Sequence, residues 1–140
     1  MPTLERVTRY AIDAPTVVYL VDEGVSVHPD HRLVAPSSIR LNALGLLFAQ
    51  VRAGRRAEGD ALRCHEKITA MKMRLLSDRV SRRAAWRIAV EHGWDSLEDG
   101  ECLAIATLQA DALVTVDQDL AARAKGLVRL ASVRDLEVPG

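Results

Sequence analysis

The feature that most constrains the fold of this sequence is a regular alternation between short apolar runs and amphipathic helical segments. It is clearest near the end, where the pattern predicts a helix over residues 97–108, a strand over 112–116, a helix over 118–125 and a strand over 127–130. Strands and helices that alternate in this way form a mainly parallel sheet with helices on both faces. The sequence therefore predicts an α/β fold with three layers and a short central sheet.

The first part of the chain shows the same alternation. The predicted elements are a strand at residues 9–12, a helix at 14–21, a strand at 33–35, a helix from 37 or 38 to 52, a helix at 58–71, a strand at 73–76 and a helix at 81–92. A chain of 140 residues, 49% of them apolar, is long enough for one ordinary core and too short for two. We therefore expect a single domain over residues 1–140.

Three aspartates stand where this fold would bring them together. Asp13 and Asp117 each end a predicted strand, and Asp99 lies in the first turn of a helix that runs antiparallel to the strand after it. All three positions fall at the carboxyl edge of a parallel sheet, where ligands bind in such folds. Each acid alone could instead cap a helix, and Ser96 with Asp99 forms a capping-box pattern. Capping gives no reason for three acids to share one edge.

Converging carboxylates are the ligands that hard divalent cations prefer. Mg²⁺ and Mn²⁺ take oxygen donors and keep several waters, so a few carboxylates around an open position can hold such an ion against a phosphate. Asp13, Asp99 and Asp117 are therefore predicted to form a Mg²⁺ or Mn²⁺ site, and a phosphodiester is the expected substrate.

Charge is unevenly distributed along the chain. The formal net charge is zero, yet residues 52–87 contain eleven basic and four acidic side chains, a local excess of seven positive charges. A basic middle with acidic ends suits a protein that binds a phosphate backbone, although most of these arginines are explained equally well as the solvated faces of helices. Aromatic residues are only 4% of the chain, which leaves few rings for stacking on bases.

The expected environment is reducing and aqueous. Cys64 and Cys102 are too few and too widely spaced for a disulfide framework, and neither has a partner at the spacing of a zinc site. Residues 1–6 lack the apolar run of a signal peptide, and no later apolar stretch approaches the roughly 20 residues that span a bilayer. We expect a cytoplasmic protein with no membrane association.

The sequence resembles the PIN-domain ribonucleases, in particular the VapC-like toxins of type II toxin–antitoxin systems. The resemblance covers most of the chain and rests on five motifs: YAIDA at 10–14, LVAPS at 33–37, RRAAWRIA at 82–89, EDGECLAIA at 98–106 and ALVTVD at 112–117. The last two are the most specific. The resemblance implies a PIN-like fold and a metal-dependent endoribonuclease that a small antitoxin protein neutralises.

Carried over residue by residue, the resemblance implies that Asp13, Asp99 and Asp117 hold Mg²⁺ or Mn²⁺ and catalyse cleavage, with Thr115 supporting the site. One position departs from the family pattern. The family usually has a Glu about six residues after the Ala-Pro turn, where this chain has Asn42, and no acid occurs from residue 37 to 57. An Asn carbonyl can ligate a hard cation but adds no charge, so weaker metal binding is expected.

Another acid could supply the carboxylate that Asn42 lacks. Asp119 is the candidate, although a surface position in a helix's first turn explains it as well. Glu101 ranks lower because it is two residues from Asp99 on the same helix and should point elsewhere.

Several other residues are expected to contact substrate or partners. Arg40, Lys72 and Arg74 are candidates for gripping RNA phosphates. The apolar residues 44–48 and the helix that follows offer more apolar surface than one core needs, and the family places an antitoxin groove and a homodimer contact among such helices.

Two alternatives to an active nuclease stay open. Asn42 is compatible with a degenerate PIN-like domain that binds RNA or a protein partner without cleavage. A phosphoacceptor domain of receiver type also clusters acids beside Mg²⁺, but it requires a Lys at the end of a late strand, and the nearby Lys125 falls at a helix end.

Overall fold

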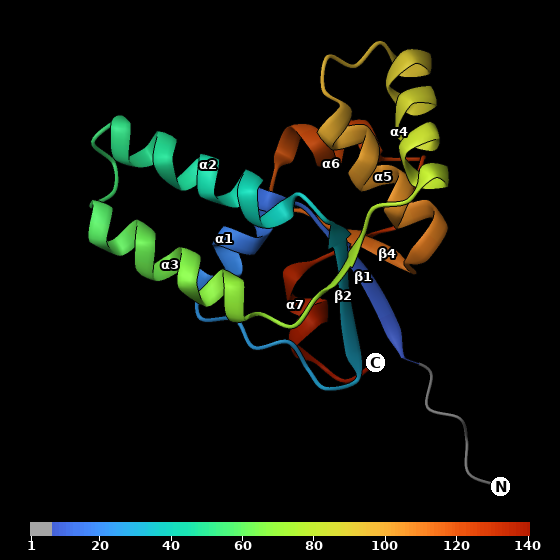
Figure 1. Cartoon of the computed structure of the whole chain (residues 1–140). Helices are drawn as coiled ribbons and strands as arrows, with labels where there is room; N and C mark the ends of the chain where they lie inside the picture. Colours follow the sequence, from blue (N-terminus) through green and yellow to red (C-terminus); the bar gives the residue numbers. More distant parts are fainter. Residues whose placement is uncertain (1–6) are drawn as a thin grey trace, which may run out of the picture.

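In a computed structural model, residues 7–140 form a three-layer α/β domain with a parallel sheet at its centre (Figure 1). The expectation about a signal peptide in residues 1–6 lies outside this described part. The strands are β1 (Thr8–Ile12), β2 (His31–Pro36), β3 (Arg74–Leu76), β4 (Ala112–Val114) and β5 (Leu130–Ala131). The helices are α1 (Ala14–Asp22), α2 (Ile39–Arg52), α3 (Glu58–Ala70), α4 (Arg79–His92), α5 (Leu97–Gln109), α6 (Gln118–Ala124) and α7 (Val133–Glu137).

The sheet has the strand order β3-β2-β1-β4-β5, and every strand pair is parallel. In the register, Tyr10 of β1 is paired with Leu33 of β2 on one side and with Ala112 of β4 on the other. The order of the strands along the chain reverses between β1 and β4. In open parallel sheets the crevice at such a reversal, outside the carboxyl ends of the strands, is the usual place for a ligand.

Alternate residues of the strands pack into two separate cores, as the period-two geometry of a strand requires. Tyr10 and Ile12 of β1 face a cluster that includes Leu20 of α1 and Leu47 of α2. Ala11, between them, faces the opposite cluster, which is built largely from α5 and α6. Helices α1, α2, α3 and α7 therefore cover one face of the sheet, while α5 and α6 cover the other and α4 packs on α5 (Figure 1).

The contact between α4 and α5 depends on a glycine. A Cβ added at Gly100 would lie 2.7 Å from the carbonyl oxygen of Ala85 in α4, a separation that real Cβ atoms do not reach. The absence of a side chain at Gly100 lets the two backbones approach this closely. The first turn of α5 is thus held directly against the middle of α4.

The predicted fold class is confirmed, and the differences concern the ends of elements. β5 begins only at Leu130, because Leu127 and Val128 first donate backbone hydrogen bonds to Ala124 and close the turn after α6. Helix α4 begins two residues before the predicted Ser81, since the Asp78 carboxylate accepts a hydrogen bond from the Ser81 N–H at 2.7 Å.

Two further differences lie in the second half of the chain. β4 ends at Val114 rather than at residue 116, and the short helix α7 was not predicted. Helix α7 has five residues, which is too short for a clear apolar period.

The helices of residues 7–140 include none with the length and apolar character needed to cross a membrane.

Candidate functional site

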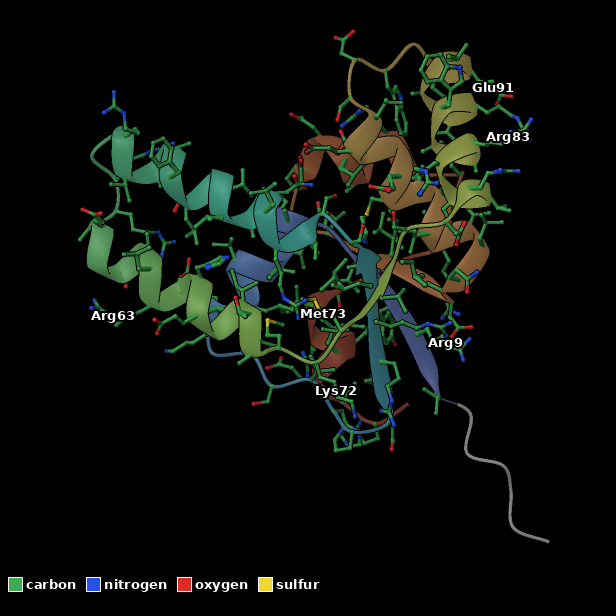
Figure 2. All side chains as sticks on the ribbon, viewed as in Figure 1. Arg9, Arg63, Lys72, Met73, Arg83 and Glu91 are labelled. Carbon is green, nitrogen blue, oxygen red and sulfur yellow. The ribbon has the colours of Figure 1, made fainter. Side chains whose placement is uncertain are left out.

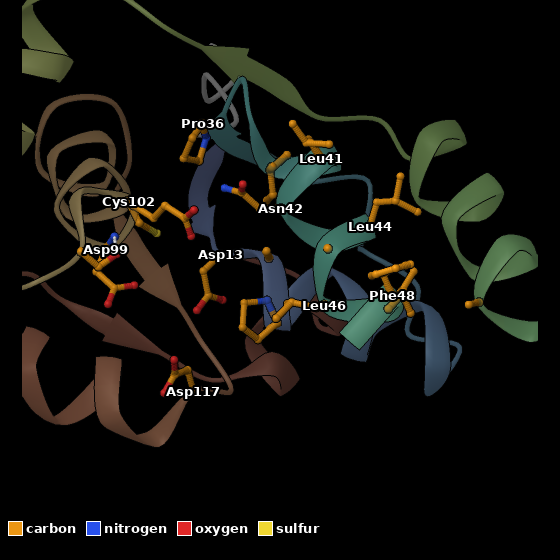
Figure 3. A pocket seen from close by; sticks show the side chains of 18 of the residues that line it. Asp13, Pro36, Leu41, Asn42, Leu44, Leu46, Phe48, Asp99, Cys102 and Asp117 are labelled. Carbon is orange, nitrogen blue, oxygen red and sulfur yellow. Dashed lines mark hydrogen bonds between the residues drawn. The ribbon is translucent and has the colours of Figure 1, made fainter. Parts of the chain in front are cut away.

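A cavity of about 980 Å³ opens at the carboxyl edge of the sheet, and four of the predicted site residues line it (Figure 3). Asp13 follows β1, Asn42 lies in the first turns of α2, Asp99 in the first turn of α5, and Asp117 precedes α6. Asp13 and Asp117 come from the two strands between which the chain order reverses. Four segments far apart in the sequence thus bring oxygen donors to one cavity, as the alternation of strands and helices predicts.

Asp13 is the most enclosed of these acids, with 8% of the residue exposed. It caps α1 by accepting a hydrogen bond from the Thr16 N–H at 3.3 Å, and the Thr16 hydroxyl donates to the same oxygen. The other oxygen accepts a hydrogen bond from the Thr115 hydroxyl at 2.7 Å. Burial raises the pKa of Asp13, and the hydrogen bonds from the two threonines partly oppose that rise. The carboxylate is therefore fixed in orientation, in surroundings where a nearby cation would favour its ionised form.

The two threonine hydroxyls also tie the end of β4 to the start of α1. The Thr16 hydroxyl accepts a hydrogen bond from the Val116 N–H at 3.0 Å. The Thr115 hydroxyl accepts one from the Asp117 N–H at 3.1 Å. Through these bonds the backbone that carries Asp117 is positioned relative to Asp13, which gives Thr115 a supporting contact at the site.

Asp117 and Asp99 each have a local partner. One Asp117 oxygen accepts hydrogen bonds from the N–H groups of Asp119 and Leu120, at 2.9 and 3.2 Å, and so caps α6. The Asp99 carboxylate forms an ion pair with Arg123 of α6. The Arg123 guanidinium lies 4.8 Å from the centre of the Trp94 ring, in a cation–π contact. Arg123 thus occupies the side of Asp99 that faces α6.

The donor set fits a hard divalent cation in kind and in position. Carboxylate and amide oxygens are the ligands of Mg²⁺ and Mn²⁺, and all four side chains line the same cavity. Within residues 7–140, however, no three His, Cys, Asp or Glu side chains are gathered closely enough to hold a metal ion. Asp99 is held by Arg123, and one oxygen of Asp117 is held by the start of α6.

Three further acids lie near the site. Asp119 is exposed in the first turn of α6 and does not line the cavity, so the surface position that the sequence also allowed describes it. Glu101 does not line the cavity either, as expected from its place on α5; partial burial raises its pKa, and the charge of Arg82 partly opposes that rise. Glu98 lines the cavity, although the sequence analysis assigned it no role. An acid in the first turn of a helix is ordinarily explained by the helix dipole, so no sequence signal distinguished Glu98.

Asn42 lines the cavity from α2, and its side-chain amide donates to the Ser38 hydroxyl at 3.3 Å. It therefore stands where the resemblance places a carboxylate, with its amide directed along its own helix. No charge from α2 reaches the cavity at this position.

The basic residues predicted to grip phosphate do not line this cavity. Arg40 donates to the Met71 carbonyl at 3.1 Å and so links α2 to the end of α3. Lys72 precedes β3 and lies toward the amino end of the sheet (Figure 2). Arg74 is the first residue of β3 and is paired with Val34 of β2. Arg123 is the cation that contacts a site acid. It was missed because a pairing between residues 24 positions apart leaves no pattern in the sequence.

The cavity continues from the acids onto an apolar surface of α2 and α3. Leu41, Leu44, Leu46, Phe48 and Leu62 line this part. Leu41 and Phe48 are 71% and 63% exposed, respectively. In Figure 3 the three aspartates stand on one side of the cavity, and Leu41, Leu44 and Phe48 stand on the other. One continuous cavity thus joins a charged end to an apolar end.

Comparisons with known proteins reveal a similar fold. No protein-family model and no curated protein matches the chain. Among solved structures, PAE2754 from Pyrobaculum aerophilum is similar, with a TM-score of 0.69 and 24% sequence identity. The match covers 92% of this chain and 93% of that chain. At this identity the similarity shows a shared α/β fold and nothing about activity.

Proposed function

We propose that this chain is a PIN-type endoribonuclease that uses Mg²⁺ or Mn²⁺ to hydrolyse RNA phosphodiester bonds. The observation that carries the proposal is the meeting of Asp13, Asp99 and Asp117 in one cavity at the strand-order reversal. The resemblance of the five sequence motifs to PIN-domain nucleases supports the same assignment.

In the proposed reaction the three acids supply the negative charge that holds the cation. Asp13, fixed by the hydroxyls of Thr16 and Thr115, supplies an oriented charge at the floor of the cavity. Asp117 and Asp99 supply further negative charge from the starts of α6 and α5. A bound divalent cation would polarise the phosphate and lower the pKa of an attacking water. Arg123, released from Asp99, would be close enough to the cavity to neutralise charge on the phosphate.

We further propose that the protein is a toxin held inactive by a small antitoxin. The apolar end of the cavity supports this, because exposed leucines and a phenylalanine beside the acids suit an apolar segment of a partner protein. A partner seated there would also cover the route to the acids. A homodimer, as in the toxins that the sequence resembles, is part of the proposal.

The direct test is an Asp13→Asn variant assayed on labelled RNA with Mn²⁺. We expect at least a hundredfold loss of cleavage, because the substitution removes the charge while leaving an oxygen that can accept from Thr16. Asp119→Asn, outside the cavity, is the matched control and should retain cleavage. Metal-dependent cleavage that survives in both Asp13→Asn and Asp117→Asn would refute the assignment.

A second candidate function is a binding-only PIN-like domain, and Asn42 is the observation that favours it. Mn²⁺ titration by calorimetry on the wild type and on Asp117→Asn separates the two candidates. Metal binding that is lost in the variant supports the nuclease. Absence of binding at millimolar Mn²⁺, together with activity gained in Asn42→Glu, supports the degenerate domain.

A further inference from the structure

Helix α4 carries an exposed face that the proposed cleavage site does not use. We call it the cationic face of α4, and it consists of Arg79, Arg82, Arg83, Trp86, Arg87 and Val90. At 3.6 residues per turn most of these positions lie on the side of the helix away from the buried Ser81, Ala85 and Ala89, and Arg82 lies at the border between the two sides. Trp86 is 65% exposed, the highest exposure of any aromatic side chain in residues 7–140. Figure 2 shows Arg83 projecting away from the body of the protein.

Three arginines of this face have no direct ionic partner in the part of the chain that the structure describes. Among the described residues, Arg79, Arg83 and Arg87 have no side-chain hydrogen bond or ion pair, and they follow one another at intervals of four along the helix. Like charges at this spacing repel, which destabilises an isolated helix. The acid of α4 itself is Glu91, four residues after Arg87 and near the end of the helix. A polyanion bound along the helix would attract these arginines and offset their mutual repulsion.

Arg82 connects the cationic face to the proposed active site. Its guanidinium donates to the Ser77 hydroxyl at 3.2 Å. On the neighbouring helix, Gly100 is adjacent to Asp99 and lies against Ala85 of α4. The cationic face therefore lies on the helix next to α5, which carries Asp99 of the cavity.

The composition of the face matches nucleic acid better than protein. Guanidinium groups contact phosphates, and the flat surface of an indole ring stacks on any base. A second copy of this chain is a poor occupant, since a twofold contact through the face would place arginines against arginines. From this we infer that the cationic face of α4 binds single-stranded RNA, through phosphate contacts of its arginines and stacking on Trp86. The inference rests on the proposed function in taking RNA as the ligand, and it gives that RNA a contact surface outside the cavity.

The test measures binding in a background that cannot cleave. Asp13→Asn protein in EDTA is titrated into a fluorescein-labelled single-stranded RNA of about 20 nucleotides, followed by anisotropy. The face variant carries Arg83→Gln and Arg87→Gln in addition. The matched control carries Arg55→Gln and Arg63→Gln, which removes the same charge from two exposed arginines on the α2–α3 side.

We expect the face variant to bind at least tenfold more weakly and the control to bind within about twofold of the parent. The slope of log K against log salt should also shrink by about 1.4 in the face variant, because each phosphate contact to a single strand contributes about 0.7. Equal losses in the two double variants would show binding by overall charge and overturn the inference. Absence of RNA binding by the parent at low salt would overturn it as well.

Trp86 provides a second readout. RNA should quench the intrinsic fluorescence of the parent, and Trp86→Phe, which retains Trp94, should lose most of that quenching while keeping part of the affinity. Trp86→Ala should bind about tenfold more weakly, as expected for one stacked base. If the face variant instead changes the sedimentation coefficient and leaves RNA affinity unchanged, the face is a protein interface and the inference is wrong. Because these readouts do not depend on metal or cleavage, failure of the nuclease assignment would be seen separately.

Discussion

The helix pairs α4–α5 and α2–α3 differ in how their helices are capped and packed. Helix α5 lines one side of the cavity, and α2 and α3 line the other. Helices α4 and α5 both begin with side-chain caps, from Asp78 and Ser96, and their backbones meet at Gly100. Helices α2 and α3 begin at Ser38 and Ala57, and neither residue makes a side-chain cap bond in the described chain. The first pair is held by caps and close backbone packing, and the second by burial of its inner side together with bonds from Arg40 and Arg56 to its ends.

The outer surfaces of the two pairs differ in composition. Helix α4 exposes four arginines, and Trp86 and Val90 are exposed among them. The α2–α3 pair leaves Leu41, Phe48 and Leu62 exposed around the cavity. A helix pair with apolar residues on both sides is expected to gain stability from a partner. The exposed surfaces therefore differ in chemistry: arginines and an indole ring on α4, and leucines and a phenylalanine beside the cavity on α2 and α3.

The largest effect is expected from Leu47→Ala in α2. Leu47 is fully buried in the core between α2 and the sheet, so truncation should lower the free energy of unfolding by about 2–5 kcal/mol. Leu41→Ala, two turns earlier on the exposed side, should change it by less than about 0.5 kcal/mol. Urea denaturation of both variants measures the difference. A large loss in Leu41→Ala would show that the outer side of α2 is already covered in the free protein.

Gly100→Ala tests the close contact of the other pair. The added Cβ would meet a backbone carbonyl, which cannot rotate away, so α4 and α5 must separate. We expect a loss of about 1–3 kcal/mol in the free energy of unfolding, together with reduced RNA cleavage, because Asp99 is the adjacent residue. Thermal unfolding and the cleavage assay measure the two effects. Unchanged stability would mean that the α4–α5 contact is more yielding than its geometry indicates.

The sequence was sufficient for the fold because the local signals and the global arrangement agree. Alternating apolar runs and helical periods indicated the parallel sheet, and the strand ends then placed Asp13 and Asp117 at one edge. The reversal of strand order between β1 and β4 was not predicted, since strand pairing depends on long-range packing. The short α7 and the late start of β5 were missed for the same reason, because turn hydrogen bonds decide where such short elements begin.

At the candidate site, residue positions were predictable and side-chain partners were not. The meeting of Asp13, Asn42, Asp99 and Asp117 around one cavity followed from where each lies in its element. The pairing of Asp99 with Arg123 could not be predicted, because the two residues lie on different helices and no sequence pattern shows that these helices are in contact. The same holds for Arg40, which had been assigned to phosphate but bonds to the Met71 carbonyl.

Gly45→Ala is the counterpart of Gly100→Ala on the α2–α3 side. Gly45 lies inside α2 with nothing within 4 Å of the position where a Cβ would be. The substitution should therefore stabilise the protein by about 0.5–1 kcal/mol, because alanine loses less backbone entropy in a helix. The same urea denaturation measures it. A destabilisation would indicate that the cavity side of α2 is closed by some contact in solution, and the contrast between the two pairs would fail.

The smallest effect concerns the cap that distinguishes α4 from α2. The hydrogen bond from the Ser81 N–H lowers the pKa of Asp78 in the folded state. A carboxylate with a lowered pKa contributes stability that is complete above its ordinary pKa, near 4, and is lost as pH falls through the folded-state value. Asp78→Asn keeps a capping oxygen and removes the charge, so the wild type should be slightly more stable at pH 7 and the difference should shrink as the pH falls below about 4. Ser38→Ala, at the start of α2, should show no such dependence. A pH-independent difference in Asp78→Asn would show that the cap acts through hydrogen bonding alone, and that charge does not distinguish the two helix pairs at their starts.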